Sequence, residues 1–501
     1  MKLLLAHDIG TSGDKASLFT EEGTQIGNYT RAYPLYQSSQ FEVEQDPEDW
    51  WQAVCDSTRW LIDHYHIDPE EIAAVSFSGQ MMGCLPLSSD GEPLMRAMIW
   101  ADQRAQRETA RLEEALPQER FYRISGHLNT PSYGIQKAMW IKGNRPDIYA
   151  ETWKFVNAKD YIVYRLTGIC RTDPSDANGM DCLDLRARTW SEEILAAAGI
   201  DPKKMPEIVE ATHVVGMVTP EAAGQTGLSQ RTKVVMGVGD GISANIGAGS
   251  VKPGRAYVCL GTSAWVASTS EEILMDSQRR NVCWAHAVPG MVAPNATMQY
   301  AGGAYNWFKN TIGTEEIEKA RALGTSPYVL LNEEAKRAAP GAGGVIFLPH
   351  LMGERAPRWN PHAKGAYLGL TASTTREELV RATLEGISLN LALCLEVINQ
   401  RHDITEMTVI GGGAKGDIGC QILADCFDMP VRIPTNLEDA GSMGAAILAG
   451  IGAGVYDGFD AVDRFVGTDR IIDPDETGRA MMREHRILLD SYYKALEPFF
   501  K

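Results

Sequence analysis

Residues 2–20 read KLLLAHDIGTSGDKASLFT, and they set the architecture of the first half of the chain. An apolar run ends at Asp8, a Gly-Thr-Ser turn follows at 10–12, and residues 15–19 form a second apolar segment. After a Glu-Gly turn, residues 25–29 predict a third strand. This order is a strand–turn–strand meander, not a strand–loop–helix unit.

The same hairpin recurs in the second half of the chain. Residues 255–260 predict a strand, Gly261-Thr262-Ser263 a turn, and residues 264–268 a return strand. Two Gly-Thr-Ser turns about half a chain apart suggest a duplicated architecture. We therefore expect two α/β lobes, each opening with a hairpin whose turn faces a shared cleft.

The other segments predict alternating helices and strands. Thr375 and Glu378 form a capping box at the start of a long helix. Along that helix apolar residues recur every three or four positions, at Val380, Leu384, Ile387, Leu391, Cys394 and Ile398. Helices are expected from near Asp46-Pro47 and over 376–399, 418–427 and 442–448, with strands over 72–78, 407–410 and 431–433. This alternation indicates a partly parallel sheet with helices on its faces.

Composition narrows the class of protein. A chain of 501 residues favours two large domains, and a formal net charge of −18 argues against general nucleic-acid binding. Nine scattered cysteines without a Cys-x-x-Cys motif predict reduced thiols in a cytoplasm. No apolar run reaches the ~18 residues of a membrane helix, and the opening MKLLLAHDIG predicts a strand rather than a secretory signal.

Two carboxylates stand beside glycine-rich turns. Asp8 precedes the first Gly-Thr-Ser turn, where a carboxylate can hold hydrated Mg²⁺ while turn amides approach a phosphate. Asp240 lies in Gly237-Val-Gly-Asp-Gly-Ile-Ser, where it could accept the proton of an attacking hydroxyl. The structural alternatives are a hairpin with a capping aspartate and a turn aspartate satisfied by its own backbone.

A third glycine-rich segment, 411–416, separates a predicted strand from a helix, as a nucleotide site requires. It fits G-x-G-x-x-G, but the next strand ends at Pro434 with no acid before Glu438, so a nicotinamide dehydrogenase is the weakest candidate. In the first half, Gln80-Met81-Met82-Gly83 and Trp100-Ala-Asp102 offer a ring face and hydroxyl partners to a polyol. The structural alternative is that Trp100 is an ordinary core residue and that Asp102 forms a surface salt bridge.

Together these motifs resemble the FGGY carbohydrate kinases, in the branch of the xylulokinases and gluconokinases. The resemblance runs nearly end to end. Beyond the segments already quoted, it rests on Lys137-Ala-Met-Trp-Ile141, Leu348-Pro-His-Leu-Met-Gly-Glu-Arg-Ala-Pro357, Arg381-Ala-Thr-Leu-Glu-Gly386, Gln421-Ile-Leu-Ala-Asp425 and Gly444-Ala-Ala446. It implies an α/β fold of two actin-like (ribonuclease H-like) lobes with a central cleft: a sugar-binding lobe over residues 1–245 and a nucleotide-binding lobe over residues 246–501. It also implies ATP and Mg²⁺ as cofactors and a small sugar as substrate.

The resemblance also implies residue roles. Asp240 would be the catalytic base, and Asp8 and Asp240 would hold the metal. The sugar site would comprise Gln80, Met81, Met82, Trp100, Asp102 and Asp240, and the ATP site Thr11, Ser12, Lys15, Gly261, Thr262, Gly412, Gly413 and Ala414. Met82 departs from the family pattern, because xylulokinases usually carry a histidine there. The residues suggest no reason for Asp14, which stands where the family often has an apolar residue.

The expected activity is ATP-dependent phosphorylation of an open-chain sugar, with a ketopentose of the xylulose or ribulose type as the first candidate. An aldonate kinase is the alternative, and Arg104 or Lys137 could then supply a cation for the carboxylate. A polyol kinase, a non-catalytic sugar-binding regulator on the same fold, and a chaperone-type or filament-forming ATPase are the other candidates. A homodimer is expected only because dimers are common among soluble enzymes.

Overall fold

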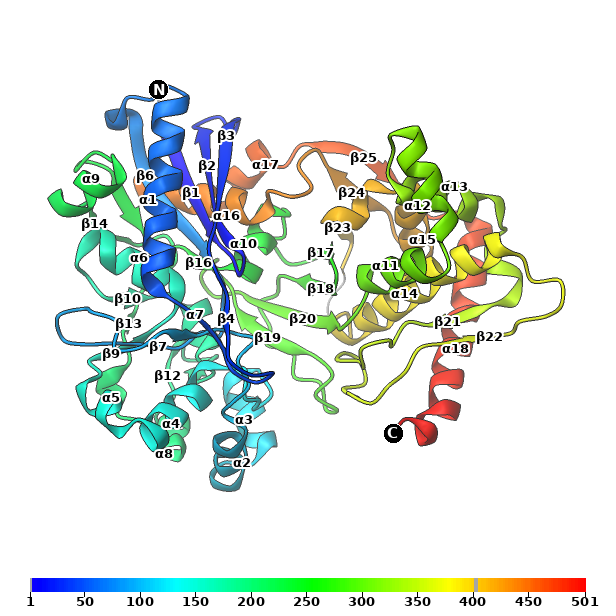
Figure 1. Ribbon diagram of the computed structural model, residues 1–501, viewed down its shortest axis with the longest axis horizontal. Coiled ribbons are helices and arrows are strands. Elements are labelled where there is room, and N and C mark those ends of the chain that lie inside the picture. Colours follow the sequence, from blue (N-terminus) through cyan, green and yellow to red (C-terminus); the bar gives the residue numbers. More distant parts are fainter. Residues whose placement is uncertain (1, 401–403) are drawn as a thin grey trace.

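The computed structural model describes residues 2–400 and 404–501. Two lobes are each built on a seven-stranded sheet (Figure 1). The first sheet has the order β14-β15-β6-β1-β2-β3, and β16 also pairs with β6. Its strands are β1 (Leu3–Ile9), β2 (Gly13–Thr20), β3 (Gln25–Ala32), β6 (Ile72–Gly79), β14 (Val214–Met217), β15 (Lys233–Val235) and β16 (Val238–Gly239).

The predicted meander is confirmed in this sheet. β1 pairs antiparallel with β2, β2 pairs antiparallel with β3, and β1 pairs parallel with β6. β1 is longer than expected, so Asp8 lies inside the strand, opposite Lys15 on one side and Ser78 on the other. Its apolar run is continuous because both faces are buried: Leu3 and Leu5 belong to one core cluster, and Leu4 belongs to another.

Helix α1 (Pro47–His64) begins where the Asp-Pro pair predicted, with Asp46 as N-cap accepting from the Glu48 amide. The helix packs on β2 and β3. Its contact with β2 also accounts for an aspartate at position 14. His7 Nδ1 lies 3.0 Å from the Asp14 carboxylate, and Ser57 Oγ of α1 donates to it over 2.6 Å. Asp14 is therefore the buried partner that satisfies His7 and ties the hairpin to α1.

The second sheet, of order β19-β20-β18-β17-β23-β24-β25, repeats the pairing of the first. β17 pairs antiparallel with β18 and parallel with β23, as β1 does with β2 and β6. This repetition confirms the expected second hairpin. The strands are β17 (Arg255–Leu260), β18 (Ala264–Ser268), β19 (Val282–Ala285), β20 (Val292–Met298), β23 (Glu406–Ile410), β24 (Val431–Pro434) and β25 (Thr468–Ile472).

Helix α14 (Arg376–Ile398) has the predicted capping box, with the Thr375 side chain accepting from the Glu378 amide. The predicted single apolar stripe is incomplete, because α14 is buried around most of its circumference. Helices α13 (Pro327–Arg337), α15 (Asp417–Phe427) and α18 (Glu476–Leu496), together with strands β18 and β20, all pack against it. Leu384 of the stripe is only half-buried, whereas the polar Asn390 is fully buried.

Helix α16 (Ala440–Ala453) returns from the second half of the chain to the first sheet. It packs on β1 and β6 and crosses α10 (Asp240–Gly247) (Figure 1). The predicted segment 442–448 is thus a longer helix. A helix from the second half of the chain therefore covers the first sheet. None of the helices in the described residues is long and apolar enough to cross a membrane.

Candidate active site

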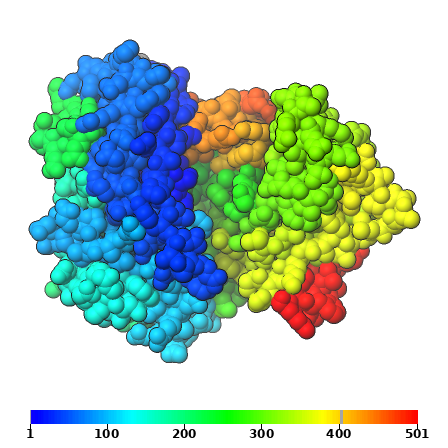
Figure 2. All heavy atoms as spheres, viewed as in Figure 1, coloured from blue at the N-terminus to red at the C-terminus, as the bar shows by residue number. Residues whose placement is uncertain are grey.

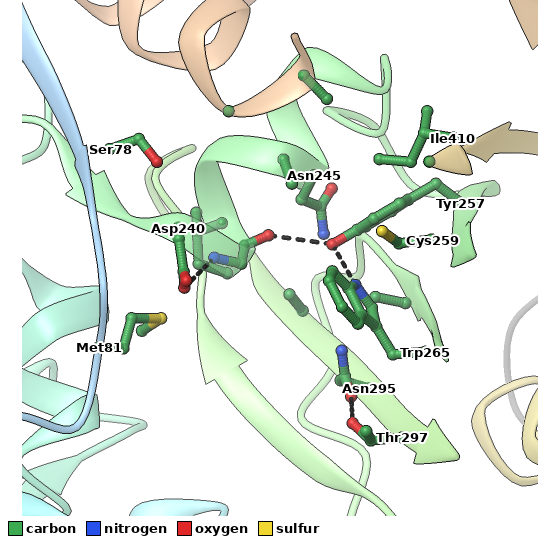
Figure 3. A pocket seen from close by; sticks show the side chains of 18 of the residues that line it. Ser78, Met81, Asp240, Asn245, Tyr257, Cys259, Trp265, Asn295, Thr297 and Ile410 are labelled. Atoms are coloured by element: carbon green, nitrogen blue, oxygen red, sulfur yellow. Dashed lines mark hydrogen bonds between the residues drawn. The ribbon is translucent and has the colours of Figure 1, made fainter. Parts of the chain in front are cut away.

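A cavity of about 680 Å³ opens between the two lobes, and its lining comes from both. Figure 2 shows the surface hollowed between the blue N-terminal lobe and the green and yellow part of the second lobe. Asp8, Ser78 and Asp240 line it from the first lobe, whereas Trp265 and Asn295 line it from the second. The side chains labelled in Figure 3 line this cavity.

Asp8 and Asp240 face this cavity from neighbouring elements. Asp8 is the second-last residue of β1, and Ser78 Oγ of β6 donates to its Oδ1 over 2.6 Å. Asp240 begins α10 directly after β16, and its Oδ1 accepts from the Gly241 amide over 2.7 Å. β16 pairs with the end of β6, so two strand ends that meet at β6 bring the carboxylates together.

The electrostatics of Asp240 suit a base. Its carboxylate is open to the cavity, while protein atoms surround it on the other sides. This environment and the negative charge of Asp8 raise the pKa of Asp240 to about 7. Burial also raises the pKa of Asp8, while the Ser78 hydrogen bond and the charge of Lys15 oppose that rise. A carboxylate that titrates near neutral pH can accept a proton and return it.

Asp240 is held from behind by the first lobe. The Gly239 amide donates to Ser175 Oγ over 2.9 Å, and Ser175 Oγ donates to Asp173 over 2.5 Å. Asp173 caps α7 (Pro174–Gly179) and pairs with the buried Lys159 at 3.1 Å. The backbone before Asp240 is therefore anchored to a fully buried ionic network, which limits how far the carboxylate can move.

Met81, Met82 and Trp100 form the first-lobe wall of the cavity. Met82 has a left-handed backbone (φ 63°), and its carbonyl accepts from Lys137 Nζ over 2.7 Å. Trp100 is 39% exposed, and its indole N–H donates to Thr11 Oγ1 over 2.8 Å. The first-lobe wall and the first Gly-Thr-Ser turn are thus joined by a hydrogen bond between residues that lie 89 positions apart in the sequence.

Two predicted sugar-site residues lie outside the cavity lining. Gln80 is buried, and its amide donates to Gln45 over 2.7 Å and to the Gly10 carbonyl over 3.3 Å. Asp102 is fully buried, where it accepts from the Val43 amide and binds the Arg104 guanidinium. Through these hydrogen bonds, Gln80 and Asp102 hold the loops behind Met82 and Trp100.

The two cations considered for an aldonate carboxylate are also engaged elsewhere. Arg104 binds both Asp102 and Glu44. Lys137 is fully buried, and its Nζ donates to the carbonyls of Met82, Ile99 and Ser132 over 2.5 to 2.7 Å. An ammonium group has three protons, so Lys137 has none left for a ligand.

The predicted nucleotide residues divide into two groups. Gly411 and Gly412 line the cavity, together with Glu438, Ala440 and Gly441. Gly413 and Ala414 continue the same turn, a short 3₁₀ helix (Gly412–Lys415) that precedes α15, but they are not part of the lining. Gly411 has φ 88°, and a Cβ at this position would meet the Leu260 carbonyl oxygen at 2.7 Å, which is why the turn needs glycine there.

Of the two Gly-Thr-Ser turns, only the second contributes a residue to the cavity lining. Ser263 lines it, whereas Gly261 and Thr262 use their carbonyls to accept amides at the start of α11 (Gly302–Thr311). Lys15 Nζ is paired with Asp439 and donates to the Glu438 carbonyl over 3.2 Å. Thr11, Ser12 and Lys15 are not among the lining residues, and their contact with ATP stays a prediction.

Sequence reasoning missed the second-lobe wall, which consists of Tyr257, Cys259, Trp265, Trp284, Asn295, Thr297 and Arg355. Figure 3 shows Trp265 pointing into the cavity beside Tyr257. The Tyr257 hydroxyl donates to the Gly241 carbonyl over 3.0 Å and accepts from the Trp265 indole over 2.8 Å. A signal existed for two of these residues: Trp265 lies just after a turn already expected at the cleft, and Arg355 lies in the Leu348–Pro357 segment that carries the family resemblance.

Comparison with known proteins gives two matches to family models and a consistent set of relatives. The N-terminal domain of the FGGY family of carbohydrate kinases matches residues 3–247, and the C-terminal domain matches residues 256–453. A gluconokinase of Bacillus licheniformis is 32% identical over 99% of this chain and 96% of its own. A xylulose kinase of Bacillus subtilis is 30% identical over 92% of this chain and 90% of its own.

Solved structures agree with these relatives. The ligand-bound xylulose kinase from Lactobacillus acidophilus superposes with a TM-score of 0.92 at 26% identity, covering 100% of this chain and 99% of its own. The gluconate kinase from the same organism gives 0.91 at 27% identity with the same coverage. The expected α/β fold of two actin-like lobes is confirmed, and with it a phosphotransferase that uses ATP. The chain belongs to the FGGY family of carbohydrate kinases.

Proposed function

We propose that the protein transfers the γ-phosphoryl group of ATP to a hydroxyl group of a small open-chain sugar or sugar acid, with Asp240 as general base. The observation that carries this proposal is the pair of carboxylates, Asp8 and Asp240, in one cavity that both lobes line. Phosphoryl transfer needs positioned groups and charge stabilisation more than covalent chemistry from the protein.

In the proposed step, the acceptor hydroxyl lies against Asp240 and its oxygen attacks the γ-phosphorus of ATP. The new oxygen–phosphorus bond forms as the bond from the γ-phosphorus to the bridging oxygen breaks. The hydroxyl proton passes to Asp240, and ADP leaves with the bridging oxygen. The Gly241 amide orients one carboxylate oxygen, which leaves the other to accept the proton.

The nucleotide would lie along the turns of the second lobe. Gly412, Gly413 and Ala414 are proposed to contact the nucleoside, next to the N-terminus of α15. Thr11, Ser12, Gly261 and Thr262 are proposed to approach the phosphates from the two hairpin turns. Lys15 would reach them by exchanging Asp439 for a phosphate oxygen.

The donor set suits Mg²⁺ bound with its nucleotide. The negative charge of Asp8 raises the pKa of Asp240, and a divalent cation bound by the two carboxylates would offset their repulsion. Within 2–400 and 404–501, no place gathers three or more His, Cys, Asp or Glu side chains in a metal cage. Mg²⁺ typically takes one or two carboxylates and completes its shell with phosphates and water. Asp8 and Asp240 would hold it, and when bound it neutralises phosphate charge.

Two acceptor classes fit an open-chain site. A ketopentose is neutral and would use only hydroxyl and carbonyl hydrogen bonds, whereas an aldonate adds a carboxylate. Met82 presents a thioether where xylulokinases usually have histidine, which removes one hydrogen-bond partner for a ketose. A cytoplasmic location is proposed on the nine free cysteines, and a homodimer stays a prediction.

The test is release of ADP, in a coupled assay with Mg-ATP, against a panel of acceptors. The panel contains D- and L-xylulose, D- and L-ribulose, tetruloses, pentitols, glycerol and D-gluconate. Turnover of one member well above the rate without acceptor supports the proposal. ATP hydrolysis that no acceptor stimulates would favour the chaperone-type ATPase, and no turnover at all would favour the non-catalytic regulator.

We expect kcat/KM for the acceptor to fall as the pH drops through about 7. A general base works only when deprotonated, and the pKa of Asp240 is raised to about 7, so the active fraction declines below that value. Initial rates between about pH 5.5 and 8.5 at saturating Mg-ATP measure this. A flat profile over that range would show that no group titrating near 7 limits the reaction.

A further inference from the structure

Asp240 lies between two glycines, and a hydroxyl group holds the backbone of each. On one side the Gly239 amide donates to Ser175 Oγ of the first lobe over 2.9 Å. On the other side the Gly241 carbonyl accepts from the Tyr257 hydroxyl of the second sheet over 3.0 Å. Glycine is the residue with the greatest backbone freedom and has no side chain for packing to hold, so these hydrogen bonds restrict it. The backbone around Asp240 is therefore held from both lobes.

The Gly241 backbone matters because it orients the carboxylate of Asp240. Its amide donates to Asp240 Oδ1 over 2.7 Å, which leaves the other oxygen for the acceptor hydroxyl. A shift of the Gly241 backbone would turn this amide away from the carboxylate. Tyr257 opposes such a shift, because it binds the carbonyl at the other end of the same residue.

Trp265 fixes the direction of the hydrogen bond that Tyr257 makes. The Trp265 indole N–H donates to the Tyr257 oxygen over 2.8 Å (Figure 3), and an indole nitrogen can only donate. The hydroxyl therefore directs its single proton to the Gly241 carbonyl, which can only accept. Burial raises the pKa of Tyr257, so the hydroxyl keeps this proton at neutral pH.

This chain of hydrogen bonds passes from the second sheet to the first lobe. Tyr257 lies on β17 and Trp265 on β18, and these strands pair antiparallel. Gly241 belongs to α10, which crosses α16 where that helix packs on the first sheet. Tyr257 is 1% exposed and shares a core cluster with Ile242 and Ile246 of α10. Close packing therefore keeps the tyrosine ring, and with it the hydroxyl, at the Gly241 carbonyl.

Trp265 supports the bond from Tyr257 while its ring faces the cavity. Hydrogen bonds in a chain polarise one another, so an indole that donates to the hydroxyl strengthens the bond that the hydroxyl donates in turn. Trp265 is half-buried and lines the cavity, as Tyr257 does. A direct contact with a ligand is therefore the alternative role for both residues. The two roles separate experimentally, because a ligand contact changes KM and a positioned base changes kcat.

We infer that Tyr257 is a positioning residue for the general base, and that Trp265 supports it by donating to its hydroxyl. The inference rests on the proposed role of Asp240. Ser175 holds the backbone before the base from the first lobe, and Tyr257 holds the backbone after it from the second. Correct placement of the base thus depends on a side chain of each lobe.

The first test is Tyr257→Phe, which removes the hydroxyl and keeps the ring. We expect kcat to fall by about 10- to 100-fold, because a misplacement of about 1 Å at a reacting group has an effect of that size. KM for the acceptor and for ATP should change by less than about 2-fold, since the hydroxyl proton goes to Gly241 and not to a ligand. The measurement is ADP release at saturating Mg-ATP, with the acceptor of the panel that wild type turns over fastest.

Tyr122→Phe is the matched control. Tyr122 lies in α3 (Gln118–Ser125), and its hydroxyl also donates to a backbone carbonyl over 3.0 Å, that of Asn281 in the second half of the chain. Tyr122 is buried and does not line the cavity. Each variant thus loses one buried tyrosine hydrogen bond between distant segments. Both should lower the melting temperature by a similar amount, but Tyr122→Phe should keep the kcat of wild type.

The second test combines Tyr257→Phe with Asp240→Asn. A residue that acts through the base has nothing to position once the base is gone. Tyr257→Phe should therefore change the remaining rate of Asp240→Asn by less than about 2-fold. A residue that only stabilises the fold would change the rate by the same factor in both backgrounds.

The third test is Trp265→Phe, which removes the indole donor. We expect kcat to fall by about 3- to 10-fold, the effect of one lost hydrogen bond, and to fall no further when the substitution is added to Tyr257→Phe. Trp190→Phe is its control, because the Trp190 indole donates to the Pro206 carbonyl over 2.7 Å outside the cavity lining. That variant should keep the kcat of wild type.

Three results would overturn the inference. The first is a kcat of Tyr257→Phe that matches that of Tyr122→Phe. The second is a loss that appears in KM with kcat unchanged, which would assign Tyr257 to ligand binding. The third is an equal effect of Tyr257→Phe with and without Asp240. Failure of the proposed function is distinct from all three, since Asp240→Asn would then itself keep the kcat of wild type.

Discussion

Replacing Asp240 by asparagine should lower kcat by about 10³-fold while the protein folds normally. Asparagine keeps the size and the hydrogen bond that the Gly241 amide donates, but it cannot accept the hydroxyl proton. The measurement is ADP release at saturating Mg-ATP and acceptor. We expect KM for the acceptor to change much less than kcat, because the lost interaction is made in the transition state.

The same substitution should raise the melting temperature. Asp240 has a folded-state pKa above its unfolded value, so its ionisation opposes folding, and this cost grows as the pH rises from about 4 to about 7. Removing the charge also relieves the repulsion from Asp8. Asp457→Asn, at an exposed site outside the cavity, should change neither quantity. Full activity in Asp240→Asn would remove this residue from the role of base.

Replacing Gly444 by alanine should destabilise the protein by about 3 kcal/mol and lower kcat by about 100-fold. Gly444 lies where α16 crosses α10, and a Cβ there would meet the Ser243 carbonyl oxygen at 2.1 Å. Backbone cannot rotate away as a side chain can, so the two helices must separate. Asp240 begins α10, and the helix would carry it away from Asp8.

Gly419→Ala is the matched control for this substitution. Gly419 is also a helical glycine, in α15, but nothing lies within 4 Å of its would-be Cβ. Alanine there should stabilise the helix by about 0.5–1 kcal/mol. Thermal unfolding and ADP release measure both variants. If Gly444→Ala melts and reacts like wild type, the close crossing of α10 and α16 does not position the base.

The hairpins were predictable because their information is local. In the first lobe, an apolar run, a Gly-Thr-Ser turn and a second apolar run suffice to specify β1 and β2, since turn residues and strand-forming residues act over a few positions. The carboxylates were predictable for the same reason. Asp240 lies between Gly239 and Gly241, and Asp8 lies two residues before Gly10, so both stand near glycines at strand ends, where a ligand can approach the backbone.

The functions of polar side chains were harder to predict because they depend on partners far along the chain. The sequence motif suggested Asp102 as a sugar ligand. In the structure its carboxylate accepts hydrogen bonds from the Arg104 guanidinium and from the amide of Val43, which lies 59 residues earlier in the chain. Lys137 looked available and is bound by three carbonyls. A donor or acceptor is free for a ligand only when folding leaves it unpaired, and no local pattern reports that.

By itself the sequence determined two duplicated lobes, the hairpin turns, the carboxylates Asp8 and Asp240, and membership of a kinase family. Only the tertiary structure decided that α16 returns to the first sheet, that Trp265 of the second lobe lines the cavity, and that Arg355 is the one cationic residue among the described residues that line it. The physical reason is the distance along the chain over which each kind of interaction acts. Backbone propensity acts over neighbouring residues, whereas burial and charge pairing depend on which distant segments the fold brings into contact.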